Sequence, residues 1–277
     1  MIENLDQNQI IFVVFIMALS AIPVGFMAGL FGIGGGLITV PVLFYIFNFI
    51  GVDQQFIMHL AVGTSFSIII PTSIISTMTH MKYKAVDFKI VKTFGLFVVF
   101  GVVLGTAFAA NMQTASLILF FSVMTMFFSI IFLTSKEKIN PKKREINLFL
   151  RIILGFSSGF LSAPMGIAGG VINTPVLKMF GYHIKVAIGS SAAVGFVIAL
   201  IGAIGFAVSG SYLNIDVPLS LGFVNIPTFL IFVPITMFMA KIGAKTVHKF
   251  DKRFIGKLFG IYLFIVSCKL FSDYFSF

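Results

Sequence analysis

Long apolar runs constrain this chain more than any other feature of its sequence. Runs close to the roughly 20 residues that an α-helix needs to cross a bilayer lie at 10–31, 57–79, 92–110, 114–134, 184–208, 217–240 and 254–272, and shorter or interrupted runs lie at 37–49, 148–163 and 168–180. The chain is 58% hydrophobic and 10% charged, whereas about a quarter of the residues of a soluble domain are charged. Backbone groups in lipid must be satisfied within the segment, and the alternating pattern of barrel strands is absent. We therefore expect an all-α polytopic membrane protein with about ten transmembrane segments.

The basic residues predict how these segments are oriented. The net charge is +10, and the Lys and Arg side chains gather at 82–92, 136–151, 178–185 and 241–257. With ten segments, all four clusters fall on the same side of the membrane, which the positive-inside rule makes the cytoplasmic side. We therefore expect both termini outside and cytoplasmic loops at 80–91, 135–147, 181–184 and 241–253. This distribution accounts for the positive charge without a nucleic-acid partner.

The two halves of the chain repeat each other. The segment "GIGGGLITVPVL" at 32–43 matches "GIAGGVINTPVL" at 166–177, and "AVGTS" at 61–65 returns as "AIGSS" at 187–191. The order of the motifs predicts a five-helix repeat at 1–134, a basic cytoplasmic linker at 135–147 and a second five-helix repeat at 148–277. Because five is odd, the second repeat enters the membrane from the opposite side, which is the inverted topology of many secondary transporters.

The glycine-rich segments predict a break in the membrane helices of each half. The apolar runs that follow them are about 13 residues long, shorter than a full span of about 20. We therefore expect two partly penetrating hairpins with glycine-rich tips that meet near the membrane centre, where irregular backbone is tolerated only if it is buried or lines a cavity. A helix begins directly after each tip, and its free N–H groups and positive dipole end attract anions. The tips therefore predict an anion site that includes Gly34, Gly35, Gly36, Ala168, Gly169 and Gly170.

Neutral polar side chains lie near both predicted tips and on the helices that follow them. Hydroxyl and amide groups donate hydrogen bonds to oxyanions, although Ser and Thr in membrane helices also bond to their own backbone. All 9 acidic residues lie in the expected loops or at segment ends, which leaves no carboxylate at the membrane centre for a cation site or a proton relay. The side chains that we expect to contact the anion are Thr39, Thr64, Ser65, Ser162, Asn173, Ser190 and Ser191.

Several motifs, taken in order along the chain, resemble one known family of membrane proteins. Both tip segments, "AVGTS" and "AIGSS", "PLSLGFVNIP" at 218–227 and the C-terminal "KIGAKTVHKF" to "RFIGKLFGIYLF" are similar to the TauE/SafE family of sulfite exporters and sulfonate permeases. The resemblance implies a carrier in the bacterial cytoplasmic (inner) membrane for sulfite, sulfoacetate or other organosulfonates. It agrees with export by alternating access, with the anion held between two helix N-termini at the repeat interface. The second tip departs from the first in carrying Ala168 where the first has Gly34.

Two other functions remain open at this point. One is a transporter or channel for another small anion, such as a carboxylate or sulfate. The other is a membrane enzyme or assembly factor that uses the scaffold without net transport. The sequence lacks the features expected of a membrane enzyme: it has no paired carboxylates in the membrane segments, no Ser/His/Asp set at one depth and no cluster of metal ligands. We therefore expect no catalytic residues, no metal and no cofactor. The expected partners are a small anion and the lipid bilayer, and a homodimer is left open.

Overall fold

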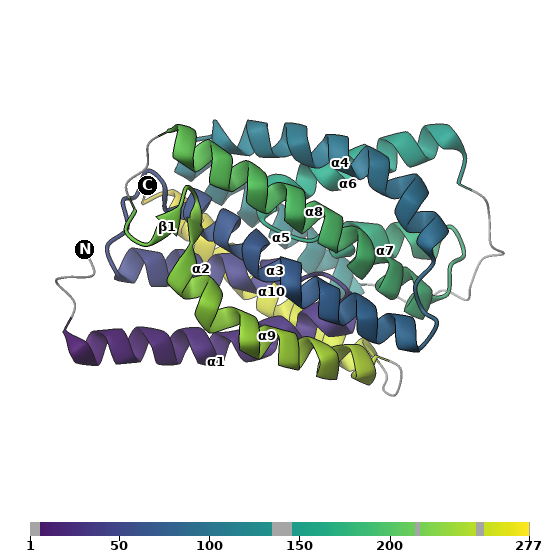
Figure 1. Cartoon of the computed structure of the whole chain (residues 1–277), viewed down its shortest axis with the longest axis horizontal. Coiled ribbons are helices and arrows are strands. Elements are labelled where there is room, and N and C mark those ends of the chain that lie inside the picture. The colour runs from purple at the N-terminus through teal and green to yellow at the C-terminus, as the bar shows by residue number, and fades with distance from the viewer. Residues whose placement is uncertain (1–5, 135–145, 214–216, 248–251, 277) are drawn as a thin grey trace.

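The computed structural model describes residues 6–134, 146–213, 217–247 and 252–276, and these form ten helices and one short ladder (Figure 1). The helices of the first half are α1 (Gln7–Phe31), α2 (Gly36–Phe49), α3 (Ile57–Lys82), α4 (Phe88–Ala110) and α5 (Thr114–Thr134). Those of the second half are α6 (Leu148–Met165), α7 (Gly170–Met179), α8 (Ile184–Tyr212), α9 (Ile226–Thr246) and α10 (Lys252–Tyr274). The ladder pairs β1 (Ser220–Leu221) with β2 (Val224–Asn225) in antiparallel fashion.

Eight of these helices are long and apolar enough to cross a membrane. The exceptions are α2, with 14 residues, and α7, with 10, which fall short of the roughly 20 that a full span requires. Large apolar side chains such as Phe15, Phe100, Phe127 and Phe238 are exposed on the outer surface of the bundle, as expected where lipid surrounds the helices. The chain is an all-α, multi-pass membrane protein, and the predicted fold class is confirmed.

One predicted span starts at the wrong residue. The apolar run 217–240 predicts a helix over its whole length, but α9 begins only after Asn225. The ladder turns the chain back before that point, and the Asn225 side chain then accepts hydrogen bonds from the N–H and the hydroxyl of Thr228. This N-cap, with Pro227 in the first turn, fixes the start of the helix. The prediction failed because hydropathy does not register a capping side chain.

The helices pack in pairs that join the two halves of the chain. Figure 1 shows α4 and α6 along one edge of the bundle and α1 and α9 along the opposite edge, with α3 and α8 between them. The pairing is symmetric under exchange of the halves, because α1 against α9 corresponds to α6 against α4, and α3 against α9 corresponds to α8 against α4. Glycines permit close contacts at both edges: Gly29 lies against the Ala240 carbonyl and Gly159 against the Val98 carbonyl.

The first half is joined to the second by the predicted basic linker, of which residues 135–145 lie outside the described residues. The linker ends at Ile146, which is buried, and at Asn147, the N-cap of α6. The Asn147 side chain accepts a hydrogen bond from the N–H of Leu150 at 2.9 Å. The start of the second half is therefore fixed by a side-chain cap.

Candidate functional site

The connection between α1 and α2 crosses the connection between α6 and α7 inside the bundle. Residues 32–36 run antiparallel to residues 166–170, so that Gly32 lies against Gly170, Gly34 against Ala168 and Gly36 against Gly166. All residues of both segments are buried. The two glycine-rich tips predicted from the sequence thus contact each other, and we call this pair of segments the crossing.

Glycine is required in the crossing for two reasons. Gly35 and Gly169, the N-cap residues of α2 and α7, have φ values of 84° and 67°, in the left-handed region that favours glycine. A Cβ on Gly36 or Gly170 would collide with the backbone of the opposite segment. Ala168 is tolerated because it faces Gly34, which has no side chain. The crossing therefore has room for a side chain at only one of the two facing positions, 34 and 168.

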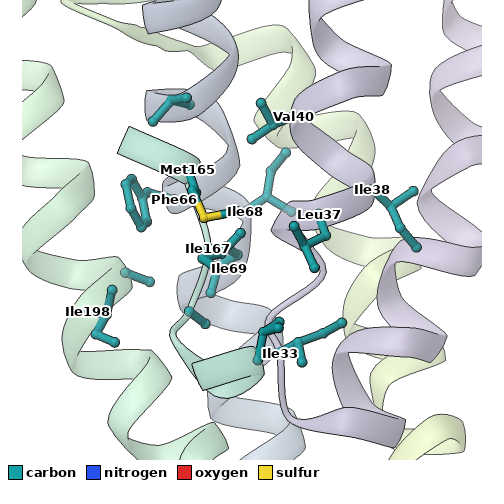
Figure 2. Close-up of a cluster of buried hydrophobic side chains, with 14 of the residues drawn as sticks. Ile33, Leu37, Ile38, Val40, Phe66, Ile68, Ile69, Met165, Ile167 and Ile198 are labelled. Atoms are coloured by element: carbon teal, nitrogen blue, oxygen red, sulfur yellow. The ribbon is translucent and has the colours of Figure 1, made fainter. Parts of the chain in front are cut away.

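The two short helices begin on opposite sides of the crossing. The first residue of α2 packs against the C-terminal end of α6, and the first residue of α7 packs against the C-terminal end of α1. The N–H groups of the first two residues of each short helix have no acceptor among the residues that the structure describes. Buried apolar side chains, including Ile33, Leu37 and Ile167, fill the crossing between the two helix ends (Figure 2). In this conformation the chain itself occupies the space between the two helix N-termini.

Thr64 and Ser190 hold the starts of two other helices. The Thr64 hydroxyl accepts a hydrogen bond from the N–H of Asn225 at 2.9 Å, and the Ser190 hydroxyl accepts one from the N–H of Asp87 at 2.9 Å. Asn225 and Asp87 are the N-cap residues of α9 and α4. These two predicted site residues therefore tie α9 to α3 and α4 to α8, although each hydroxyl keeps a proton to donate.

Three further predicted side chains have partners within the protein. Ser65 donates to the carbonyl of Gly166 in the crossing at 2.9 Å. Thr39 donates to the carbonyl of Gly35, the N-cap of α2, at 3.1 Å. Ser191 accepts a hydrogen bond from Thr174 at 3.0 Å, which joins α8 to α7. These hydroxyls brace the crossing and the helices beside it.

Ser158, Ser162 and Asn173 have no such partners. All three side chains are at most 1% exposed, and none of their polar atoms finds a hydrogen-bond partner in the described part of the chain. Ser158 Oγ and Asn173 Nδ2 each lie 3.1 Å from the position that a Cβ on Gly169 would take, so both approach the N-cap of α7. Buried polar groups are satisfied in most proteins, and leaving one unsatisfied is costly. We call these three side chains the polar cluster.

Ser158 is a site candidate that the sequence reading missed. It lies one helical turn before Ser162, and residues four apart share one face of a helix. The four-residue spacing of the two serines just before the second tip could therefore have identified Ser158 from the sequence.

Neither segment of the crossing carries a charged side chain. The described carboxylates belong to Asp6, Asp53, Asp87 and Asp273, which lie in loops or near helix ends. Among the described residues, no group of three or more His, Cys, Asp or Glu is placed to hold a metal ion. The polar chemistry at the crossing consists of backbone N–H groups, hydroxyls and one amide.

Comparison with known proteins assigns a family to this arrangement. A family model described as "Sulfite exporter TauE/SafE" matches residues 16–270. The chain belongs to the TauE/SafE family. A "Probable membrane transporter protein" of Haemophilus influenzae is 30% identical over 247 residues, which cover 89% of this chain and 94% of the relative. Another, of Methanocaldococcus jannaschii, is 30% identical over 233 residues, which cover 83% and 85% of the two chains.

A relative with the same description in Bacillus subtilis is 26% identical over 266 residues, which cover 89% of this chain and 93% of the relative. No solved structure matches the chain. The TauE/SafE match spans the crossing and the polar cluster, and it confirms the resemblance that the tip motifs indicated.

Proposed function

We propose that this chain carries small sulfur-containing oxyanions, such as sulfite, sulfoacetate or another organosulfonate, across the bacterial inner membrane. Membership of the TauE/SafE family supports a membrane transporter of this kind. The observation that carries the proposal is the buried polar cluster beside the start of α7, because it supplies neutral hydrogen-bond donors where the chain leaves them unused.

The local chemistry suits an oxyanion better than a cation. The positive dipole end and free N–H groups of a helix N-terminus stabilise negative charge. The Asn173 amide and the serine hydroxyls add donors without a fixed charge. The described carboxylates lie in loops or near helix ends, and none belongs to the crossing or the polar cluster. The two short helices begin at Gly36 and Gly170, each against the opposite segment of the crossing.

Alternating access fits the way the crossing is packed. Apolar side chains and two contacting backbones close the centre of the bundle in this conformation. Each half contributes one hairpin to the closure, and the helix pairing is symmetric under exchange of the halves. We propose that transport separates the hairpins first on one side and then on the other, as in carriers built from inverted repeats. On this proposal both termini lie outside, and export is the direction of transport.

Flux into proteoliposomes tests the proposal. We expect uptake of radiolabelled sulfite or sulfoacetate that saturates with concentration and is competed by the unlabelled anion, with protein-free liposomes as the control. Saturable flux of acetate or sulfate alone would instead favour a carrier for another small anion. Specific binding with no flux would favour a membrane protein that uses the scaffold without transport.

A further inference from the structure

The two halves of the site have different side chains at equivalent positions. Aligning the tip motifs pairs Ser158 with Val24 and Ser162 with Ala28. The same alignment pairs Asn173 with Thr39. The backbone of the crossing is nearly symmetric, but the polar cluster belongs wholly to the second half. The first half has unpartnered buried side chains of its own, such as Ser76 and Thr106, but none at the positions equivalent to the polar cluster.

At the first tip, the positions equivalent to the polar cluster are apolar or satisfied. A Cβ on Gly35 would lie 2.8 Å from a methyl group of Val24, where the equivalent position on Gly169 faces polar atoms. Thr39 donates to the carbonyl of Gly35, the N-cap of α2. Thr72, the nearby hydroxyl on α3, donates to a carbonyl of its own helix and pairs with Thr236 at 2.8 Å. At these equivalent positions the first tip therefore has no unpartnered polar side chain.

The second tip cannot satisfy itself in the same way. A serine hydroxyl can rotate to a carbonyl one turn earlier, but an amide has two donor hydrogens and an acceptor oxygen. Both polar atoms of Asn173 lack a partner while the side chain is 1% exposed. Ile198 of α8 adds an apolar wall, since its terminal methyl lies 2.5 Å from the Cβ position of Gly169.

We infer that ligand recognition is one-sided: Ser158, Ser162 and Asn173, with the N-terminus of α7, bind the oxyanion, and the first tip closes over it without donating a side-chain hydrogen bond. This inference rests on the proposed function. It specifies that the second half of the chain supplies the side chains that bind the ligand. It assigns Ser158 as a ligand contact and removes Thr39 from the set of contacts.

A measurement without ligand gives the first test. Replacing an unsatisfied buried polar group with an apolar one is neutral or stabilising, whereas removing a satisfied one is destabilising. We expect purified Ser158→Ala and Asn173→Leu to melt at or above the parent temperature. Thr72→Val, which loses a paired hydroxyl, is the matched control and should melt below it. The inference would be overturned if the melting temperatures of Ser158→Ala and Asn173→Leu fell as far below that of the parent as the melting temperature of Thr72→Val. Such a result would show that these polar groups have structural partners.

Affinity for sulfite and sulfoacetate, measured by isothermal titration calorimetry, gives the second test. We expect Ser158→Ala and Asn173→Leu to weaken binding by about tenfold to a hundredfold, the range for a hydrogen bond to a charged group. Thr39→Val, at the position equivalent to Asn173, should bind within about twofold of the parent. Equal losses in Thr39→Val and Asn173→Leu would refute the one-sided site but leave the proposed function intact. A parent protein that binds neither anion would refute the proposed function, and the melting temperatures would still decide whether the polar cluster is unsatisfied.

Discussion

Replacing Gly170 with alanine tests the packing of the crossing most directly. A Cβ at this position would lie 2.0 Å from the carbonyl oxygen of Gly32 and 2.8 Å from the Cα of Ile33. Both neighbours are backbone atoms, so no side-chain rotation relieves the clash. Restoring an ordinary contact distance of about 3.5 Å would separate the two segments by about 1.5 Å.

Overpacking of a buried contact costs about 1–3 kcal/mol, and more where backbone has to move. For a chain of this size, each kcal/mol shifts the melting temperature by about 2–4 °C. Because both neighbours of the Cβ are backbone atoms, we take a cost of about 3 kcal/mol and expect Gly170→Ala to lower the apparent melting temperature by about 6–12 °C, measured as loss of the monodisperse peak after heating in detergent. Gly95→Ala is the matched control, because a Cβ there meets nothing within 4 Å and alanine favours a helix interior. If Gly170→Ala melts with the parent while Gly95→Ala behaves as expected, the two backbones are not in contact.

Three further predictions concern topology, charge and the hydrogen bond to Asp87. On a Cys268→Ser background, a cysteine introduced at position 140 should react with an impermeant maleimide only from the cytoplasmic face, and labelling of intact cells would contradict the inverted arrangement. Asn173→Asp places a carboxylate against the bound anion. A repulsion of about 4 kcal/mol at about 4 Å predicts a loss of roughly a thousandfold in sulfite affinity, measured by calorimetry. An affinity equal to that of the parent would exclude the anion from this helix end. Ser190→Ala removes the acceptor for the N–H of Asp87 and should lower the free energy of unfolding by about 1–3 kcal/mol, with faster hydrogen exchange at the start of α4 and unchanged sulfite affinity. Unchanged exchange there would show that this hydrogen bond does not hold the helix.

The start of α9 and the polar cluster show where sequence reasoning reached its limit in this protein. Hydropathy placed α9 in the correct region but not at the correct residue, because the start depends on the Asn225 side chain and on a turn that pairs β1 with β2. The position of the second tip indicated Ser162 and Asn173, but nothing in their sequence context distinguished them from polar side chains that are satisfied within the protein. Thr64 and Ser190 occupy equally suggestive motifs, and the structure shows them bonded to helix N-caps.

The amino-acid sequence alone was enough to predict an all-α membrane protein with two glycine-rich segments and with all 9 acidic residues outside the apolar runs. These conclusions depend on apolar run length, self-similarity and composition, which are local properties of the chain. That the tips run antiparallel, with Gly36 against Gly166 and Gly170 against Gly32, is seen only in the folded structure. The folded structure also determines which polar side chains have partners, because a hydrogen bond such as that between Ser65 and Gly166 joins atoms 101 residues apart. Whether a buried hydroxyl is satisfied depends on such distances, and residue order alone does not specify them.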